Sequence, residues 1–307
     1  MSLGVCLPGG GAKGAFQAGV LEALYNRGIK KYDSYACTSI GAMNGYYLYT
    51  ENVDKMKKMW ISEKNLCGKR FKSVDNIIDN SEDFKPLYEL KKYRIPENSS
   101  FYINYLQVRD KIGKEIIVDI SKFNHKNRVD YIKYSCALPY HQWGELFSIK
   151  EVKEYIKEGK FDGCNLDGGM ARNTYIDPLI ENNVDKILII STRHNFELPQ
   201  RVKEKIDNNK IVIISPKTSV DNKEMLNFSS EFCSKMYKEG YDIGLKFDLD
   251  LLKKWFFLIN NAYSYKIKKE NLYCIYKIEK FKIYFSIKWY IIKYENEQMK
   301  GRNQHGK

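Results

Sequence analysis

The 307-residue chain lacks three features that each define a class of proteins. Its seven cysteines are scattered, odd in number and never spaced as Cys-x-x-Cys, so they indicate reduced, mostly buried thiols rather than a metal or redox pair. Its four histidines form no cluster with Cys or Asp at metal-ligand spacing. No run of 18 or more apolar residues occurs, so we expect no membrane-spanning helix.

A secretory signal is also missing from the start of the sequence. Met1, Ser2 and Leu3 lead directly into a short apolar run without a charged leading segment, which predicts a cytoplasmic protein. The net charge of +13 is uneven, because the 57 positions from Leu251 onward hold 13 Lys and Arg against four Asp and Glu. This basic, aromatic-rich tail predicts either peripheral contact with anionic lipid, at on the order of 1 kcal/mol per cation, or a solvated segment.

The hydrophobic pattern predicts one large α/β domain. The first 50 residues alternate between expected strands, at 3–7 and 32–37, and helices that begin near Ala12 and Ile40. The continuous apolar runs at 186–191 and 210–215 are typical of strands buried on both faces of a parallel sheet. We therefore expect a three-layer sandwich with a mostly parallel central sheet and helices on both sides.

The segments outside this strand and helix alternation are predicted to be of several kinds. Residues 51–98 indicate a helical cap, and a helical region from 224 to about 260 is expected to be interrupted at Gly240 and Gly244. Further strands are expected at 101–108, 115–120 and 161–166, and apolar residues at every odd position of 281–291 indicate an amphipathic strand. We thus predict a main domain, 1–260, and a C-terminal extension, 261–307.

A cluster of glycines follows the first expected strand. Gly9, Gly10 and Gly11 permit positive φ and leave no Cβ between their amide hydrogens and a bound oxygen. The helix expected to begin near Ala12 directs its positive N-terminal end to the same place. The cluster is therefore a candidate oxyanion hole, in which the loss of one N–H donor typically costs roughly 3 kcal/mol of transition-state stabilisation.

The same glycines also fit a nucleotide-binding pattern. The spacing Gly9-x-Gly11-x-x-Gly14, with Asp33 about 20 residues further on, satisfies the dinucleotide fingerprint. In that fold, however, the acidic residue ends the second strand, whereas Asp33 begins it. A phosphate loop fits less well, because Lys13 is followed by Gly14 and not by Ser or Thr. Lys13 is interpreted either as a residue that tunes the loop or contacts a lipid phosphate, or as an exposed lysine at a helix start.

Ser39 lies between an expected strand and an expected helix, with the small residues Cys37 and Gly41 two positions before and after it. This arrangement holds a serine on a sharp, exposed turn with its hydroxyl projecting outward. The first glycine of the usual pattern is replaced here by Cys37, whose Cβ weakens the prediction of a tight turn. The simpler interpretation is a serine that only caps the helix beginning at Ile40.

Asp167 is followed by Gly168 and Gly169 at the end of an expected strand. Glycines after a carboxylate allow another side chain to approach it. Asp-Gly is also a common turn dipeptide, so this motif alone would predict only a β-turn.

Four motifs, taken in order, resemble those of the patatin-like phospholipases, also called bacterial patatins: residues 9–14, 38–44, 135–139 and 167–169. The resemblance extends over roughly residues 3–250 and departs from the family pattern at Cys37 and Pro8. It implies an enzyme that hydrolyses carboxylic esters of phospholipids or lysophospholipids, with no cofactor, no metal and no nucleic acid as partner.

The resemblance also implies roles for residues. Ser39 would attack the acyl carbonyl, Asp167 would take its proton, and the amides of Gly9, Gly10 and Gly11 would hold the oxyanion. A carboxylate base of this kind must be partly desolvated, with its pKa near the working pH. The supporting positions are Lys13, Gly14, Gly41, Gly168 and Gly169.

The surroundings of the acyl chain are predicted from the same resemblance. The apolar pair Leu138 and Pro139 and the expected cap at 51–98 would form its walls. We treat this as a hypothesis, because only the apolar positions near the motifs support it.

A histidine-containing triad stays open as an alternative mechanism. The order Ser39, Asp167, His194 is that of the α/β-hydrolases. In that fold, however, one N–H of the oxyanion hole comes from a loop upstream of the nucleophile, after the third strand, whereas Ser39 follows only the second expected strand. The other histidines are expected on the surface or in loops: His125, His141 and His305.

Two alternatives without hydrolysis also stay open. A lipid-binding or regulatory module could keep the fold after losing turnover, and Cys37 is the one substitution that favours it. A dinucleotide-binding protein would bind its ligand at the glycine cluster without esterase activity.

Overall fold

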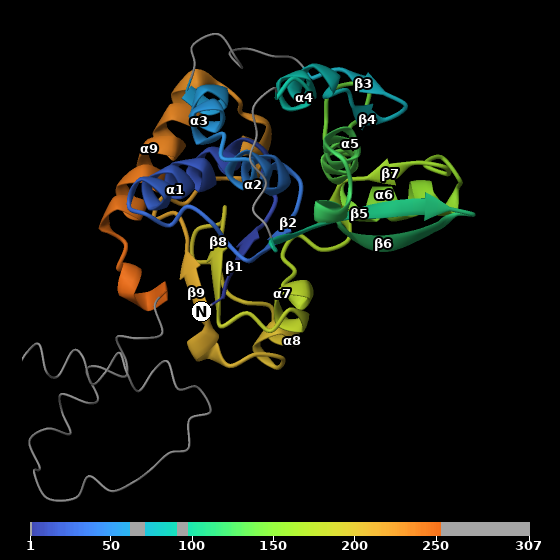
Figure 1. Ribbon diagram of the computed structural model, residues 1–307. Helices are drawn as coiled ribbons and strands as arrows, with labels where there is room; N and C mark the ends of the chain where they lie inside the picture. Colours follow the sequence, from blue (N-terminus) through green and yellow to red (C-terminus); the bar gives the residue numbers. More distant parts are fainter. Residues whose placement is uncertain (1, 62–70, 91–97, 253–307) are drawn as a thin grey trace, which may run out of the picture. The chain divides into compact units, whose positions relative to one another are not determined.

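The computed structural model describes residues 2–61, 71–90 and 98–252 (Figure 1). The chain divides into two compact units, Met1–Phe256 and Phe257–Lys307, and all described residues belong to the first. The predicted C-terminal extension, with its alternating segment at 281–291, lies outside the described residues. The boundary predicted at 260/261 stays a prediction.

A mixed, mostly parallel sheet forms the centre of the described unit, in the strand order β6-β5-β2-β1-β8-β9. Strands β1, β2, β5, β8 and β9 run parallel to one another, whereas β6 and the short β7 are antiparallel to β5. The strand bounds are Leu3–Leu7 for β1, Ser34–Cys37 for β2, Ser100–Arg109 for β5, Ile112–Asp119 for β6, Asn165–Leu166 for β7, Lys186–Ile190 for β8 and Ile211–Ile214 for β9.

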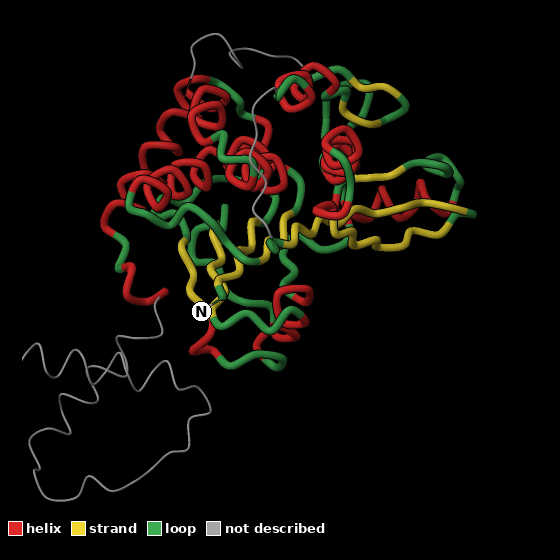
Figure 2. The backbone as a smooth tube through the Cα atoms, in the orientation of Figure 1, coloured by secondary structure: helices red, strands yellow, loops and turns green. Residues whose placement is uncertain are grey.

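Helices cover both faces of this sheet, so the three-layer arrangement predicted from sequence is confirmed (Figure 2). Alternate residues of the central strands point to opposite faces: Val5 and Leu188 pack into the larger core, whereas Cys6 and Ile189 pack into the smaller one. The larger core receives α1 (Gly14–Asn26), α2 (Ile40–Tyr49), α3 (Val53–Ile61) and α9 (Ser230–Lys246), and the smaller one α7 (Asp177–Glu181) and α8 (Gln200–Lys203).

The hairpin expected between 101 and 120 is present as β5 and β6. Its turn is formed by Asp110 and Lys111, both with positive φ, as two-residue hairpins require. The strand predicted at 161–166 is wrong for its first four residues, since only Asn165 and Leu166 pair with β5. Gly163 has φ +87°, a turn conformation that ends any extended backbone before it.

The predicted cap at 51–98 is only partly helical. It contains α3, then a hairpin of β3 (Ser73–Val74) and β4 (Ile77–Ile78), then α4 (Ser81–Tyr88). The α3 helix packs on α1, α2 and α9 as part of the helical layer, whereas α4 packs on α5 (His125–Ser135). The hairpin was missed because its strands are only two residues long and give no period-two signal.

The helix expected from 224 begins later, at Ser230, and continues through both of its glycines to Lys246. Gly240 and Gly244 do not interrupt it, so that prediction is wrong. A Cβ on Gly240 would lie 2.1 Å from the carbonyl oxygen of Phe16, and one on Gly244 would lie 2.7 Å from Cβ of Ala23. These glycines therefore allow the backbones of α9 and α1 to pack in direct contact.

A third, smaller core lies between α6 (Ile149–Lys157) and the strands β5 and β7. There α6 packs its buried Val152 and Ile156 against β5 and β7. The α6 helix begins with a capping box between Ser148 and Glu151, the pairing expected for Ser followed three residues later by Glu. This core packs on the second half of β5, at Leu106 and Val108. Leu166, the residue before Asp167, pairs with Leu106 there.

Candidate active site

Ser39 lies at the turn between β2 and α2. Its backbone has φ 53° and ψ −129°, a region that L-residues rarely occupy. The Ser39 side chain makes no capping hydrogen bond to α2, and its N–H donates to Oγ of Ser135 at 2.8 Å. The backbone of Ser39 is thus fixed from α5, and its hydroxyl is available for another partner.

That partner is Asp167. Oγ of Ser39 donates a 2.6 Å hydrogen bond to Oδ2 of Asp167, across 128 positions of sequence. The second carboxylate oxygen, Oδ1, accepts the N–H of Gly169 at 2.7 Å, and the N–H of Asp167 donates to the carbonyl of Ala137 at 2.8 Å. The motif at 135–139 therefore binds both partners, through Ser135 on one side and Ala137 on the other.

Burial determines the acidity of Asp167. The residue is 3% exposed, and this desolvation raises the pKa of its carboxyl to about 6, although the hydrogen bonds from Ser39 and Gly169 favour the ionised form. A carboxylate with such a pKa is ionised near neutral pH yet basic enough to accept a proton.

The glycine loop is held by side chains from the other end of the chain. The carbonyl of Gly9 accepts hydrogen bonds from Oγ1 of Thr192 at 2.9 Å and from Nδ2 of Asn173 at 3.3 Å. Because a trans peptide directs its N–H opposite to its C=O, these bonds turn the N–H of Gly10 away from Thr192 and Asn173. No described residue accepts a hydrogen bond from that N–H.

Glycine is required in this loop for two reasons. Gly11 has φ +54°, and a Cβ there would lie 2.1 Å from the carbonyl oxygen of Met225. At Gly10, a Cβ would lie 2.5 Å from Oγ1 of Thr192. A side chain at either position would therefore push the loop away from Met225 or from Thr192.

The supporting glycines bring the helices close to the strands. A Cβ on Gly41 would lie 2.1 Å from the carbonyl oxygen of Leu7, and one on Gly14 would lie 2.7 Å from Cγ1 of Ile40. Both positions therefore permit α1 and α2 to begin beside the glycine loop and beside each other.

The Asp167 turn is supported by an asparagine that sequence reasoning missed. A Cβ on Gly168 would lie 2.4 Å from the backbone oxygen of Asn104, whose side chain donates to the carbonyl of Gly168 at 3.3 Å and accepts from Oγ1 of Thr38 at 2.9 Å. The signal was present in the sequence, since Asn104 is a polar residue in the middle of a mostly apolar strand run. Thr192 could likewise have been found, because it lies two positions after the end of a buried parallel strand.

Lys13 is not the exposed helix-start lysine considered above. It is 5% exposed, and burial lowers its pKa, with the nearby Arg193 cation lowering it further and Asp221 opposing both. Lys13 therefore lies inside the site region rather than in bulk solvent.

A cavity of about 510 Å³ contains Ser39, Asp167 and the three loop glycines. The other polar residues of its lining are Lys13, Asn80, Glu82, Asp83, Asn173, Thr192 and Arg193. The apolar part of the lining includes Met43, Met59, Trp60, Phe71, Ile78, Phe84, Leu138, Met225, Leu226 and Phe228. Of the predicted wall, Leu138 lines the cavity together with residues from 51–98, whereas Pro139 is not among its lining residues.

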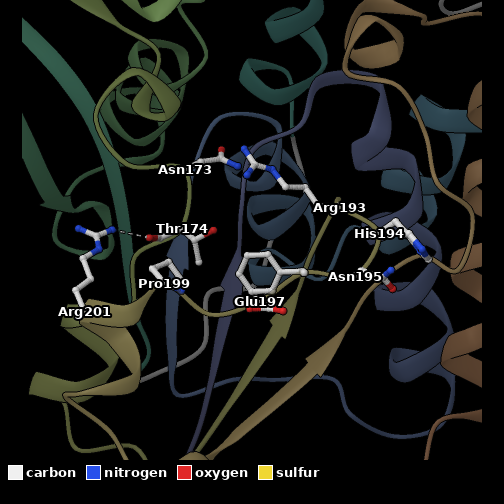
Figure 3. A pocket seen from close by; sticks show the side chains of 9 residues that line it. Asn173, Thr174, Arg193, His194, Asn195, Glu197, Pro199 and Arg201 are labelled. Carbon is white, nitrogen blue, oxygen red and sulfur yellow. Dashed lines mark hydrogen bonds between the residues drawn. The ribbon is translucent and has the colours of Figure 1, made fainter.

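The histidines lie elsewhere. His194 lines a separate cavity of about 320 Å³, shown in Figure 3, and its Nδ1 is 3.0 Å from the carbonyl of Pro216. The hydrogen bonds described for Asp167 go to Ser39 and to Gly169, so the structure does not bring His194 to the carboxylate. His141 lies in a loop, one of the two expected settings, but it is buried, with 3% of its surface exposed, and it stacks on Trp143 and Phe147.

The dinucleotide interpretation lacks its acidic residue. Oδ2 of Asp33 accepts the N–H of Leu3 at 2.6 Å, at the amino end of β1, whereas the glycine loop follows the carboxyl end of that strand. Among residues 2–61, 71–90 and 98–252, no group of three or more His, Cys, Asp or Glu is placed to hold a metal ion. In the same described ranges, no helix has both the length and the hydrophobicity needed to cross a bilayer.

Comparison with solved structures gives distant likenesses. The chain is similar to VipD from Legionella pneumophila, with a TM-score of 0.39 and 12% identity over 77% of this chain and 67% of that one. It is also similar to the type III effector protein ExoU, with a TM-score of 0.35 and 11% identity over 78% of this chain and 53% of that one. The chain thus spans about half of ExoU. No match was found among curated protein sequences.

A family model gives the assignment. The model described as patatin-like phospholipase matches residues 5–180, which is more than half of the chain and includes the glycine loop, Ser39 and Asp167. The chain therefore belongs to the patatin-like phospholipase family.

Proposed function

We propose that this protein hydrolyses acyl esters of phospholipids or lysophospholipids with Ser39 as nucleophile and Asp167 as general base. The observation that carries the proposal is the 2.6 Å hydrogen bond between Oγ of Ser39 and the buried carboxylate of Asp167, beside the glycine loop. Membership of the patatin-like phospholipase family supports lipid hydrolysis as the reaction class.

In the first step, Oγ of Ser39 attacks the carbonyl carbon of the ester while its proton passes to Oδ2 of Asp167. The carbonyl oxygen becomes an oxyanion, and the amides of the glycine loop are the donors that stabilise it. Collapse of the tetrahedral intermediate breaks the bond to the alkoxy group, which takes the proton from Asp167 and leaves as an alcohol.

In the second step, water attacks the acyl-enzyme carbonyl and gives its proton to Asp167. Collapse of the second intermediate releases the fatty acid, and the proton returns to Oγ of Ser39. The raised pKa of Asp167, about 6, makes its carboxylate a stronger base than an ordinary aspartate, so it accepts the proton more readily. The same pKa lies close enough to neutral pH for the proton to be given up again.

The many apolar residues of the cavity lining favour a lipid over a small polar ester. Side chains such as Trp60, Phe84 and Leu138 remove an acyl chain from water, at about 25 cal/mol for each Å² of apolar surface buried. The acyl group would lie along these apolar side chains, with its carbonyl between Ser39 and Gly10.

The test combines active-site labelling with product analysis. A fluorophosphonate probe should label the unmodified protein, and Ser39→Ala should abolish labelling and reduce ester hydrolysis on the order of 10³-fold or more. Purified protein incubated with a mixed lipid extract should release fatty acid, and Asp167→Asn should not. Lipid binding without labelling or fatty-acid release would instead identify a non-catalytic lipid-binding module.

A further inference from the structure

The active-site cavity adjoins a second cavity of different character. Asn173 and Arg193 line both, the first of about 510 Å³ and the second of about 320 Å³. In Figure 3 the guanidinium of Arg193 points toward the side chain of Asn173. Because Asn173 also donates to the carbonyl of Gly9, the junction of the two cavities lies directly beside the glycine loop.

Arginines outnumber carboxylates in the lining of the second cavity. Arg193 and Arg201 both line the second cavity, and Nη2 of Arg201 donates to the carbonyl of Thr174 at 3.1 Å. The one acidic residue of that lining, Glu197, lies 3.9 Å from Nζ of Lys203 with its side chain 86% exposed. Solvent therefore screens the charge of Glu197, and the Lys203 cation partly offsets it.

Arg193 itself is well placed to bind an anion. Its backbone is fixed by a 3.0 Å hydrogen bond from its N–H to Oγ of Ser191, while its side chain is exposed at the cavity. Buried Lys13 lines the same active-site cavity, whose lining also contains the carboxylates of Glu82, Asp83 and Asp167. Arg193 lies near enough to Lys13 for their repulsion to lower the pKa of Lys13. A bound anion would relieve this repulsion, and Asp221 is the carboxylate near Lys13 that partly does so now.

We propose that Arg193 binds the phosphate of the lipid headgroup, with the polar remainder of the headgroup in the second cavity and the acyl chain in the first. This inference rests on the proposed function, which it extends by assigning a phosphodiester as the group recognised. The planar guanidinium suits this role because it can donate two parallel N–H bonds to phosphate oxygens. The ester carbonyl of a glycerophospholipid lies only a few bonds from its phosphate, as the adjoining cavities require.

The experiment compares two substrates that differ only in the phosphate-bearing headgroup. Hydrolysis of lysophosphatidylcholine and of the monoacylglycerol with the same acyl chain is measured for the unmodified protein, Arg193→Gln, Arg193→Lys and Lys153→Gln. Lys153 is an exposed lysine on α6, outside both cavities, and serves as the matched control for loss of a surface charge.

Arg193→Gln should lower kcat/KM for lysophosphatidylcholine by roughly 10- to 100-fold, the usual effect of losing a hydrogen bond to a charged group. The loss on monoacylglycerol should be about tenfold smaller. For lysophosphatidylcholine, the kcat/KM of Arg193→Lys should lie between those of the unmodified protein and Arg193→Gln, because lysine keeps the charge but cannot donate two parallel N–H bonds. Equal losses on both substrates, or no loss on either, would overturn the assignment.

Binding of sn-glycerol 3-phosphate gives a readout that needs no turnover. Isothermal titration calorimetry should show binding at least about tenfold weaker for Arg193→Gln than for Lys153→Gln. Equal affinity in the two variants would refute the phosphate site even if the protein hydrolysed no ester. Absence of hydrolysis with intact, Arg193-dependent binding would instead refute the proposed function alone.

Discussion

Oγ1 of Thr192 donates a 2.9 Å hydrogen bond to the carbonyl oxygen of Gly9, joining the end of β8 to the loop after β1. The bond fixes the peptide whose N–H belongs to Gly10, one of the proposed oxyanion donors. Thr192 is 3% exposed and in contact with the loop, so its hydroxyl and its methyl group both define where that peptide lies.

We predict that Thr192→Val lowers kcat roughly tenfold with little change in KM. Valine keeps the shape of threonine but cannot donate to Gly9, so the Gly10 N–H becomes less well oriented for a charge that exists only in the transition state. Steady-state kinetics on a phospholipid check this, with Thr192→Ser as the control that keeps the hydroxyl. An unchanged kcat in Thr192→Val would contradict it.

The pH dependence of hydrolysis should follow Asp167. Since the base must be ionised, kcat/KM should fall about tenfold per pH unit below the pKa of about 6 and level off above it. Initial rates between pH 4.5 and 8 measure the profile. The inflection should persist in His194→Gln, and its disappearance there would indicate a histidine base instead.

Asp167 should also lower stability at neutral pH. Its folded-state pKa lies above the ordinary 3.8, so the folded protein binds the proton more tightly than the unfolded chain does, and stability declines as pH rises from about 4 to about 6. Asp167→Asn removes this penalty and should raise the free energy of unfolding at pH 7.5 by about 2 kcal/mol relative to its effect at pH 4. Urea denaturation at both pH values measures it, and an increment independent of pH would rule out ionisation as the cause.

The backbone of Ser39 should carry strain. With φ 53° and ψ −129°, it occupies a region that glycine enters freely and other residues enter at a cost of about 1 to 3 kcal/mol. Ser39→Gly should therefore unfold at a higher denaturant concentration than Ser39→Ala, which keeps the Cβ and loses the same hydroxyl. Equal stability of the two variants would show that the turn is relaxed.

The central strands were predictable because each is a continuous apolar run or follows a glycine turn. The runs at 186–191 and 210–215 became β8 and β9, and the first 50 residues gave β1, α1, β2 and α2 within a few residues. The antiparallel addition of β7 could not be predicted, since a two-residue strand is defined by its neighbour β5 and not by its own pattern.

The candidate site was predictable as motifs but not as an environment. The order of the Gly9, Ser39 and Asp167 motifs suggested which groups to compare, and the structure places the Ser39 and Asp167 side chains in hydrogen-bonding contact. The burial that raises the pKa of Asp167, and the bonds from Thr192 and Asn173 to Gly9, depend on packing between distant segments. No local pattern encodes them.

The contact between Gly240 of α9 and Phe16 of α1 has a consequence for synthesis on the ribosome. The α1 helix is synthesised first, and the α9 helix that covers it follows more than 200 residues later. During translation, Phe16 therefore stays uncovered until α9 has been made. A fragment ending at residue 180, where the family match stops, would leave this apolar surface uncovered and should aggregate.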